Sequence, residues 1–234
     1  MVEIQHVTLD DYLSRPHWGN TKVYRGVSDA TYELVTTMGR LPLANDTVRE
    51  QYENEVFLEF KRRAHPFLRK IPDSDLEWLF LARHYNLPTR LLDWTTNPLV
   101  ALFFATESNR TTDFAVYTKL VVNWYQTVSS DSDLFRDMKE GFGLRPSHTD
   151  ARYLSQSGVF TIHPSYRVDT DADRVVKFVF PSSSREEVRE RLSRFGILPS
   201  FIYANLDGVA QDILRQTTFP NPDGSRSVKG FDWA

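Results

Sequence analysis

An acidic residue stands among apolar neighbours in the segment from Arg83 to Thr95, and these surroundings restrict what it can do. An unpaired buried carboxylate costs on the order of several kcal/mol, so Asp93 must accept hydrogen bonds, pair with an arginine or serve a ligand. Arg25, Arg83 and Arg90 are its candidate partners. Two interpretations stay open. Asp93 caps the next helix or holds loops together, or it lines a binding site.

A cationic residue near the start of the chain, Arg25, is the second candidate for chemistry. A guanidinium group donates two parallel hydrogen bonds to a phosphate group and keeps its charge at every relevant pH. Gly26 follows it, and a residue without a side chain allows a turn or a close approach of the backbone to a ligand. We predict that Arg25 and the segment Asp93-Trp94-Thr95 line one polar pocket for a nucleotide.

Periodicity and capping signals predict the first elements of the chain. Residues 21–27 are β-prone and are predicted as the first strand. A helix is predicted to begin at Thr47, because Thr47-x-x-Glu50 forms a capping box, and to end at Pro66. Its apolar residues recur every four positions, which predicts a buried face made of Val48, Tyr52, Val56, Phe60 and Ala64.

The elements around Asp93 carry clearer signals. A helix capped by Ser74 is predicted to end near Asn86, because Pro88 disfavours its continuation. Leu91 to Thr95 is predicted as an extended segment, in which alternation places Asp93 and Thr95 on one face and Leu92 and Trp94 on the other. Asn97 is the predicted N-cap of a buried apolar helix with Pro98 at its first position.

Later segments add strands and two further helices. Strands are predicted over 114–122, 159–163 and 174–180, and helices over 183–194 and 207–216. The elements lack the regular alternation of a doubly wound parallel sheet. The predicted fold class is α+β, with a mixed, mostly antiparallel sheet packed with helices.

Composition excludes several kinds of protein. Of the 234 residues 41% are hydrophobic and 13% aromatic, which predicts a packed core. The net charge of -3 gives no general attraction to nucleic acid or to an anionic membrane. Cysteine is absent, and the histidines form no i,i+4 pair of the kind that binds zinc, so we predict no metal. Neither a secretory signal nor a membrane-spanning run is visible, so we expect a cytoplasmic protein without a membrane partner.

Several groups of residues resemble the FRG domain family. The motifs extend from about residue 20 to 165, with a further similarity to the family's C-terminal part. They are Tyr24-Arg25-Gly26, residues 36–40, the long block of residues 84–105, residues 156–160 and Leu206-Asp207-Gly208. The resemblance implies a single FRG-type domain over residues 1–234, in which 219–234 form a C-terminal tail. The family is found in bacteria and phages, and we know it mainly as a domain without an assigned activity.

A more distant resemblance, to the ADP-ribosyltransferase superfamily, implies a chemistry. Arginine-type enzymes of that superfamily carry a Tyr-Arg-Gly-like first strand, a Ser-Thr-Ser segment before an apolar helix, and a strand with Glu-x-Glu. Tyr24-Arg25-Gly26 is similar to the first element, and Asp93-Trp94-Thr95 stands where Ser-Thr-Ser is expected. The expected catalytic glutamate falls on Gly158. The resemblance also implies an ADP-ribosyltransferase-like form of the α+β fold.

This resemblance implies NAD as a substrate and a role for each site residue. The bond between nicotinamide and ribose breaks through an oxocarbenium-like state, which a nearby carboxylate stabilises. The predicted catalytic residues are Asp93 for that charge, His84 as a general base and Gln156 for a ribose hydroxyl. The predicted cofactor-binding residues are Arg25, Gly26, Tyr85, Arg90, Trp94 and Thr95, of which Tyr85 and Trp94 would stack on a base.

Three functions follow as hypotheses. The first is an NAD-binding ADP-ribosyltransferase or NAD glycohydrolase that acts as a bacterial or phage toxin or defence effector, with a protein or nucleic acid as acceptor. The second is a non-catalytic module that senses a nucleotide or a partner, which the missing glutamate favours. The third is a nuclease, which needs a carboxylate cluster around a metal.

Overall fold

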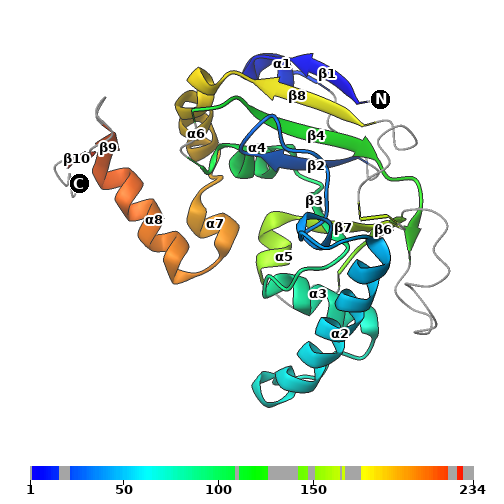
Figure 1. Ribbon diagram of the computed structural model, residues 1–234. Coiled ribbons are helices and arrows are strands. Elements are labelled where there is room, and N and C mark those ends of the chain that lie inside the picture. Colours follow the sequence, from blue (N-terminus) through cyan, green and yellow to red (C-terminus); the bar gives the residue numbers. More distant parts are fainter. Residues whose placement is uncertain are drawn as a thin grey trace.

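The fold is organised around an eight-stranded sheet with the strand order β1-β8-β4-β2-β3-β7-β6-β5 (Figure 1). The computed structural model describes residues 2–15, 22–108, 111–125, 142–146, 151–163, 165–166, 175–220 and 226–228. Its strands are β1 (Glu3–His6), β2 (Lys22–Val27), β3 (Leu91–Thr95), β4 (Phe114–Leu120), β5 (Trp124–Tyr125), β6 (Phe142–Leu144), β7 (Gly158–Ile162), β8 (Val176–Phe180), β9 (Thr218–Pro220) and β10 (Arg226–Val228).

Helices join and cover these strands. They are α1 (Leu9–Leu13), α2 (Asp46–Ala64), α3 (Asp75–His84), α4 (Pro98–Thr106), α5 (Ala151–Gln156), α6 (Arg185–Arg194), α7 (Pro199–Tyr203) and α8 (Leu206–Thr217), with 3-10 turns η1 (Met38–Arg40), η2 (His65–Phe67) and η3 (Ser182–Ser184). In the large sheet β1 pairs with β8 and β5 with β6 in parallel, while the other neighbours pair antiparallel. The predicted α+β class with a mixed, mostly antiparallel sheet is confirmed.

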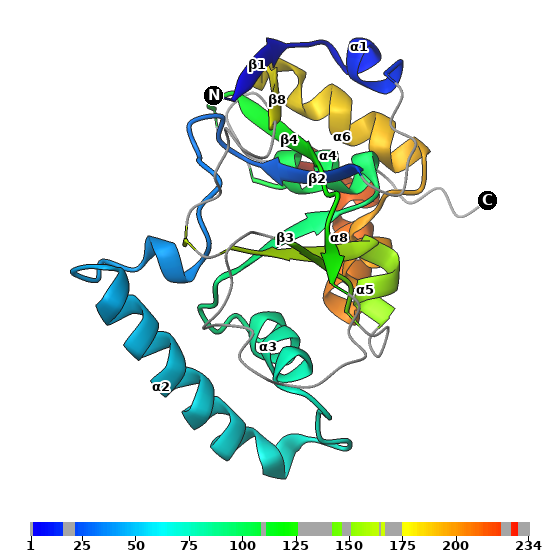
Figure 2. The ribbon, with the colours of Figure 1, turned by 90° about the vertical axis from the view of Figure 1, so that its right-hand side faces the viewer.

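The sheet consists of two halves that enclose a shared apolar layer. One outer face, on β2, β4 and β8, packs against α1, α4 and α6. The other outer face, on β3, β6 and β7, packs against α2 and α3. Between the halves lies a core to which Val23, Val27 and Tyr117 contribute from one side and Leu92 and Trp94 from the other. Figure 2 shows these layers from top to bottom, with β2 and β3 lying apart where the two halves meet.

The helices that flank β3 begin at the predicted signals. The side chain of Ser74 accepts the backbone N–H of Glu77 at the start of α3. Asn97 caps α4 with Pro98 in its first turn, and α4 is buried on nearly every side. The face prediction for β3 holds too, since Leu92 and Trp94 both enter the inner core.

The prediction for α2 needs correction. Its N-cap is Asn45, which accepts from the N–H of Val48, so the helix begins at Asp46 and not at Thr47. Phe60 and Ala64 pack on the outer core as predicted, but Val48 and Tyr52 are exposed. The buried positions in the middle of α2 are Glu53 and Phe57. One turn of an α-helix takes 3.6 residues, so residues spaced strictly four apart drift around the helix and do not stay on one face.

The end of the chain contains a short strand pair. Thr218–Pro220 and Arg226–Val228 pair as the antiparallel hairpin of β9 and β10, so part of the predicted tail of residues 219–234 is a strand pair. Residues 221–225 and 229–234 lie outside the described part. The short elements β1, α1, α5 and α7 were not predicted from the sequence.

Gly26 lets β2 lie directly against α4. A Cβ atom at this position would stand 1.9 Å from the carbonyl oxygen of Ala101 and 2.6 Å from the backbone nitrogen of Ala105. Both obstacles are backbone atoms of a helix, which cannot rotate away. The glycine is therefore required for packing, and the close approach that the sequence suggested is to a helix.

We predict that Gly26→Ala lowers the free energy of unfolding by about 3 kcal/mol, the upper end of the usual cost of overpacking. Urea denaturation measures this change. The control is Gly196→Ala, where no atom lies within 4 Å of a new Cβ but the backbone has φ +75°. That variant should lose only about 1 kcal/mol, the cost of a left-handed alanine. Equal losses in the two variants would contradict the packing role of Gly26.

Candidate functional site

A fork in the sheet creates the candidate site. Tyr24 lies opposite Thr95, and this is the single register pair between β2 and β3 within their described lengths. Each of the two strands continues to pair with its other neighbour, β2 with β4 and β3 with β7. Beyond Tyr24 the strands diverge, and a pocket of about 350 Å³, here called the fork pocket, opens beside them. The described residues of its lining are Tyr24, Arg25, Gly26, Val27, Ser28, Tyr32, Arg40, Arg83, Asp93, Trp94, Thr95, Phe104 and Gln156.

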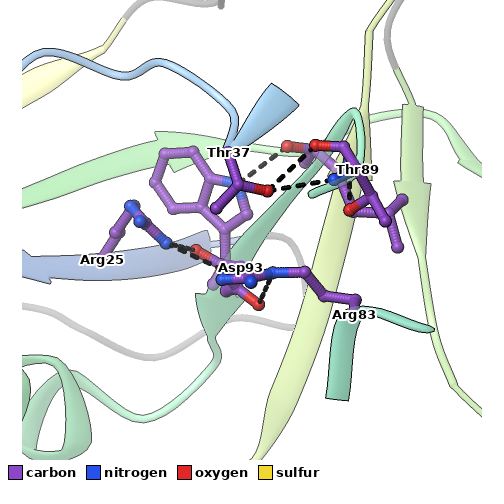
Figure 3. A network of polar contacts seen from close by, with 8 residues as sticks. Arg25, Thr37, Arg83, Thr89 and Asp93 are labelled. Atoms are coloured by element: carbon purple, nitrogen blue, oxygen red, sulfur yellow. Dashed lines mark hydrogen bonds and ion pairs between the residues drawn. The ribbon is translucent and has the colours of Figure 1, made fainter. Parts of the chain in front are cut away.

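Two arginines converge on Asp93 in this pocket (Figure 3). Arg83 donates from Nε to both carboxylate oxygens, at 3.1 and 3.2 Å, and from Nη2 to Oδ2 at 2.6 Å. Arg25 donates from Nη1 to the backbone carbonyl oxygen of Asp93 at 2.7 Å and lies 3.4 Å from Oδ2. The cluster therefore joins α3, β2 and β3. The side chain of Arg25 donates the hydrogen bond to the Asp93 carbonyl that a backbone N–H of a neighbouring strand would give in a continuous sheet.

The end of α3 places Arg83 at the fork. Asn86 has the left-handed φ of 62°, and the N–H groups of Asn86 and Leu87 donate to the carbonyls of Arg83 and Ala82. This is a Schellman motif, in which asparagine is tolerated at the left-handed position. The chain then turns toward β3, so Arg83 in the last helical turn faces Asp93.

Burial and charge act in opposite directions on Asp93. Burial alone would raise the pKa of its carboxyl group, but the guanidiniums of Arg83 and Arg25 outweigh it and hold the pKa below its usual value. Burial also lowers the pKa of Arg25, opposed by Asp93, while Arg40 and Arg83 add to the lowering. Asp93 is thus an ionised carboxylate at neutral pH, with 38% of its side chain still exposed.

Positive charge remains in excess around the fork pocket. Among its described lining residues, three arginines (Arg25, Arg40 and Arg83) face one carboxylate, that of Asp93. Arg40 is exposed, and within the described part of the chain it forms no ion pair. It stands at the end of η1, which Thr37 fastens to Thr89 through hydrogen bonds of 3.1 and 3.2 Å (Figure 3).

Arg40 and Tyr32 are site residues that sequence reasoning missed. Arg40 belongs to the motif of residues 36–40 that resembles the FRG family, so a signal for it existed in the sequence. Tyr32 lies outside every such motif. Its backbone carbonyl accepts a hydrogen bond of 2.6 Å from the hydroxyl of Tyr117, which fixes this part of the chain beside the sheet.

Most of the predicted site residues meet at the fork. Arg25, Gly26, Asp93, Trp94, Thr95 and Gln156 all line the fork pocket. A smaller neighbouring pocket of about 110 Å³, here called the side pocket, has His84 in its wall. Arg83, Asp93, Trp94 and Gln156 line both pockets, so the ion pair of Arg83 and Asp93 stands between the two spaces.

Two predicted residues lie elsewhere, and their placement is corrected. Arg90 is 4% exposed and pairs with Glu53 of α2, its Nε donating at 2.7 Å and its backbone N–H at 2.8 Å. Tyr166 donates its hydroxyl to the same carboxylate at 3.1 Å. Tyr85 is 65% exposed, packs edge-on against His84 and is absent from the described lining of both pockets. Arg90 is thus not a partner of Asp93 in the described contacts, because its carboxylate partner, Glu53, comes from a distant helix.

Several polar groups in the walls are already occupied by internal contacts. The hydroxyl of Thr95 donates to the carbonyl of Gln156 at 2.6 Å and accepts from the N–H of Asn97 at 3.0 Å. The indole N–H of Trp94 donates to Thr161 at 2.8 Å, and the amide nitrogen of Gln156 donates to the carbonyl of Ile202 at 3.1 Å. These residues hold the walls in place, and Arg25, Arg40 and Arg83 carry the charge.

Metal-binding clusters and membrane-spanning helices are absent from the described part of the chain. Within the described residues no group of three or more histidine, aspartate or glutamate side chains is placed to hold a metal ion. None of the described helices combines the length and apolar character that crossing a bilayer requires.

We predict that Asp93 contributes to the pH dependence of stability. Its folded pKa lies below the unfolded value, so its contribution is present above the unfolded pKa and is lost as the pH falls through the folded one. Asp93→Asn should lower the free energy of unfolding at pH 7 by about 1–2 kcal/mol, less than for a fully buried pair because the carboxylate is partly exposed. Urea titrations from pH 7 to pH 3 should show a shallower decline for this variant than for the wild type. Asp207→Asn, an exposed substitution in α8, serves as control. Parallel curves for wild type and Asp93→Asn would contradict the assignment.

Comparison with known proteins identifies the domain that carries the fork. Residues 20–113 match the family model of the FRG domain. No curated protein and no solved structure matches the chain. The matched range contains Arg25, Arg40, Arg83 and Asp93, the charged residues of the fork pocket. The motifs at residues 156–160 and 206–208 lie outside the matched range. The predicted family is confirmed over residues 20–113, where the chain carries an FRG domain.

Proposed function

We propose that this chain binds NAD in the fork pocket. The observation that carries the proposal is the charge balance of the described lining, in which three guanidinium groups face a single carboxylate. Arg83 and Arg25 share the one carboxylate of Asp93, so with Arg40 the described lining carries a positive surplus. A diphosphate group is the ligand that suits this surplus best, because guanidinium and phosphate groups form parallel, charge-assisted hydrogen bonds.

Aromatic rings on the same walls support a ligand with a flat base. Tyr32 is 37% exposed, and Phe104 and Trp94 also line the pocket. A base can lie on such rings, and stacking of this kind tolerates different bases. The volume of about 350 Å³ falls in the range of small-molecule sites. Cations and rings around one cavity favour a nucleotide over a simple anion such as phosphate.

The chemistry that we propose for bound NAD is cleavage of the bond between nicotinamide and ribose. The carboxyl group of Asp93 stays ionised at neutral pH, and its negative charge can stabilise an oxocarbenium-like state. The resemblance to ADP-ribosyltransferases supports this chemistry. It also supports the role of a toxin or defence effector, either as a transferase or as an NAD glycohydrolase.

A non-catalytic sensing module is the second candidate, and two observations favour it. Both carboxylate oxygens of Asp93 accept hydrogen bonds from Arg83, which reduces the charge available to a reaction. Gly158, where a catalytic glutamate was expected, lies opposite Thr95 in β7 and brings no carboxylate to the fork. The nuclease hypothesis has no comparable support, since no metal-holding cluster was found among the described residues.

Calorimetry with NAD tests the binding proposal. Arg40→Gln should weaken binding about tenfold to a hundredfold, because a hydrogen bond to a charged group contributes about 1.5–3 kcal/mol. Arg25→Gln should abolish detectable binding, since it removes both a charge and the contact with β3. Arg40 is the more informative position because it is exposed and its replacement leaves the folded core intact.

The matched control is Arg62→Gln, an exposed arginine of α2 outside the described lining of the pocket. It should bind NAD like the wild type. Equal losses for Arg40→Gln and Arg62→Gln, or no heat of binding with the wild type, would reject the proposal. Chromatography that detects released nicotinamide distinguishes the catalytic function from the sensing function.

A further inference from the structure

The side pocket adjoins the fork pocket, and Arg83 and Asp93 line both. Besides the four shared residues, its described lining consists of His84, Asn86, Gly158, Val159 and Phe160. It opens to solvent and reaches the same carboxylate as the fork pocket. A second reactant could therefore approach Asp93 from this side while a nucleotide occupies the other.

Charge restricts what the side pocket can accept. The carboxylate among its described lining residues is that of Asp93, and Arg83 already binds both of its oxygens. A guanidinium or ammonium group entering here would lose hydration without gaining a free counter-charge, and it would be repelled by Arg83. The last carbonyls of α3, which would otherwise attract a cation, accept the N–H groups of Asn86 and Leu87.

Size restricts the pocket further. About 110 Å³ holds a few water molecules or a small hydroxyl compound. The amide of Asn86 lies in the wall and offers both a donor and an acceptor to such a neutral group.

We propose that the side pocket delivers an uncharged nucleophile, water, to the ribose of NAD held in the fork pocket, so that the reaction is hydrolysis. This inference rests on the proposed function. The bond from the ribose C1′ to the nicotinamide nitrogen breaks, and its electron pair leaves with nicotinamide. The oxygen of water bonds to C1′ and its proton passes to solvent, which gives ADP-ribose. A guanidinium acceptor, such as an arginine side chain, is excluded by its charge.

The test incubates the full chain with NAD, alone and with agmatine, a small guanidino compound, and separates the products by chromatography. Nicotinamide and ADP-ribose should appear in equal amounts, and agmatine should yield no adduct. Predominant ADP-ribosyl agmatine would overturn the inference. NAD binding by calorimetry without release of nicotinamide would also overturn it, while leaving the binding proposal in place. Failure of NAD to bind would reject both proposals, so the two failures are distinguishable.

A charge variant tests the cause of the selectivity. Asn86→Asp keeps the shape of the side chain, tolerates the left-handed backbone and adds a carboxylate to the side pocket. It should form a detectable agmatine adduct under conditions in which the wild type forms none. Asn205→Asp makes the same chemical change at the N-cap of α8, outside the described lining of both pockets, and should leave the products unchanged. An adduct fraction that is the same in all three proteins would overturn the charge argument.

Discussion

The carboxylate and the backbone carbonyl of Asp93 accept hydrogen bonds from two guanidinium groups, and the rest of the site depends on these contacts. Where β2 and β3 separate, the carbonyl of Asp93 loses the strand partner that a continuous sheet would provide. Arg25 replaces that partner with its side chain, and Arg83 fixes the carboxylate from the end of α3. A buried backbone acceptor and a partly buried charge are therefore satisfied by the same cluster. The fork stays open because side chains, and not a strand, close its hydrogen bonds.

This arrangement links binding and chemistry through one set of charges. The closer Arg83 and Arg25 hold Asp93, the lower the pKa of its carboxyl group and the smaller the share of its charge that a reacting ribose would experience. The arginines that neutralise Asp93 are also those that would hold an anionic ligand. A ligand phosphate competes with the carboxylate for the same donors, so occupancy of the fork pocket would release part of the charge of Asp93. Under the proposed function, ligand binding in the fork pocket and the reactivity of Asp93 would be coupled for this reason.

Local signals predicted the elements on which the site is built. Ser74, Asn97 and Pro98 mark helix starts, because a cap contacts only backbone groups a few residues away in the sequence. The alternation of Leu92, Asp93 and Trp94 predicted the two faces of β3 correctly. Long-range partners could not be predicted in this way. Glu53 lies 37 residues from Arg90 on a helix whose buried face was misassigned, and no local pattern distinguishes Arg90 from Arg83 as the partner of Asp93. The parallel pairing of β1 with β8 joins segments about 170 residues apart in the sequence and likewise leaves no trace in periodicity.

The buried group of Glu53, Arg90 and Tyr166 has an evolutionary consequence. Replacement of Glu53 alone removes the carboxylate that pairs with Arg90 in an interior where both side chains are 4% exposed, while simultaneous replacement of the pair by apolar residues of similar volume avoids that penalty. Substitutions at positions 53 and 90 are therefore tolerated together and selected against singly. In an alignment of homologous chains, substitutions at position 53 should therefore be accompanied by substitutions at position 90.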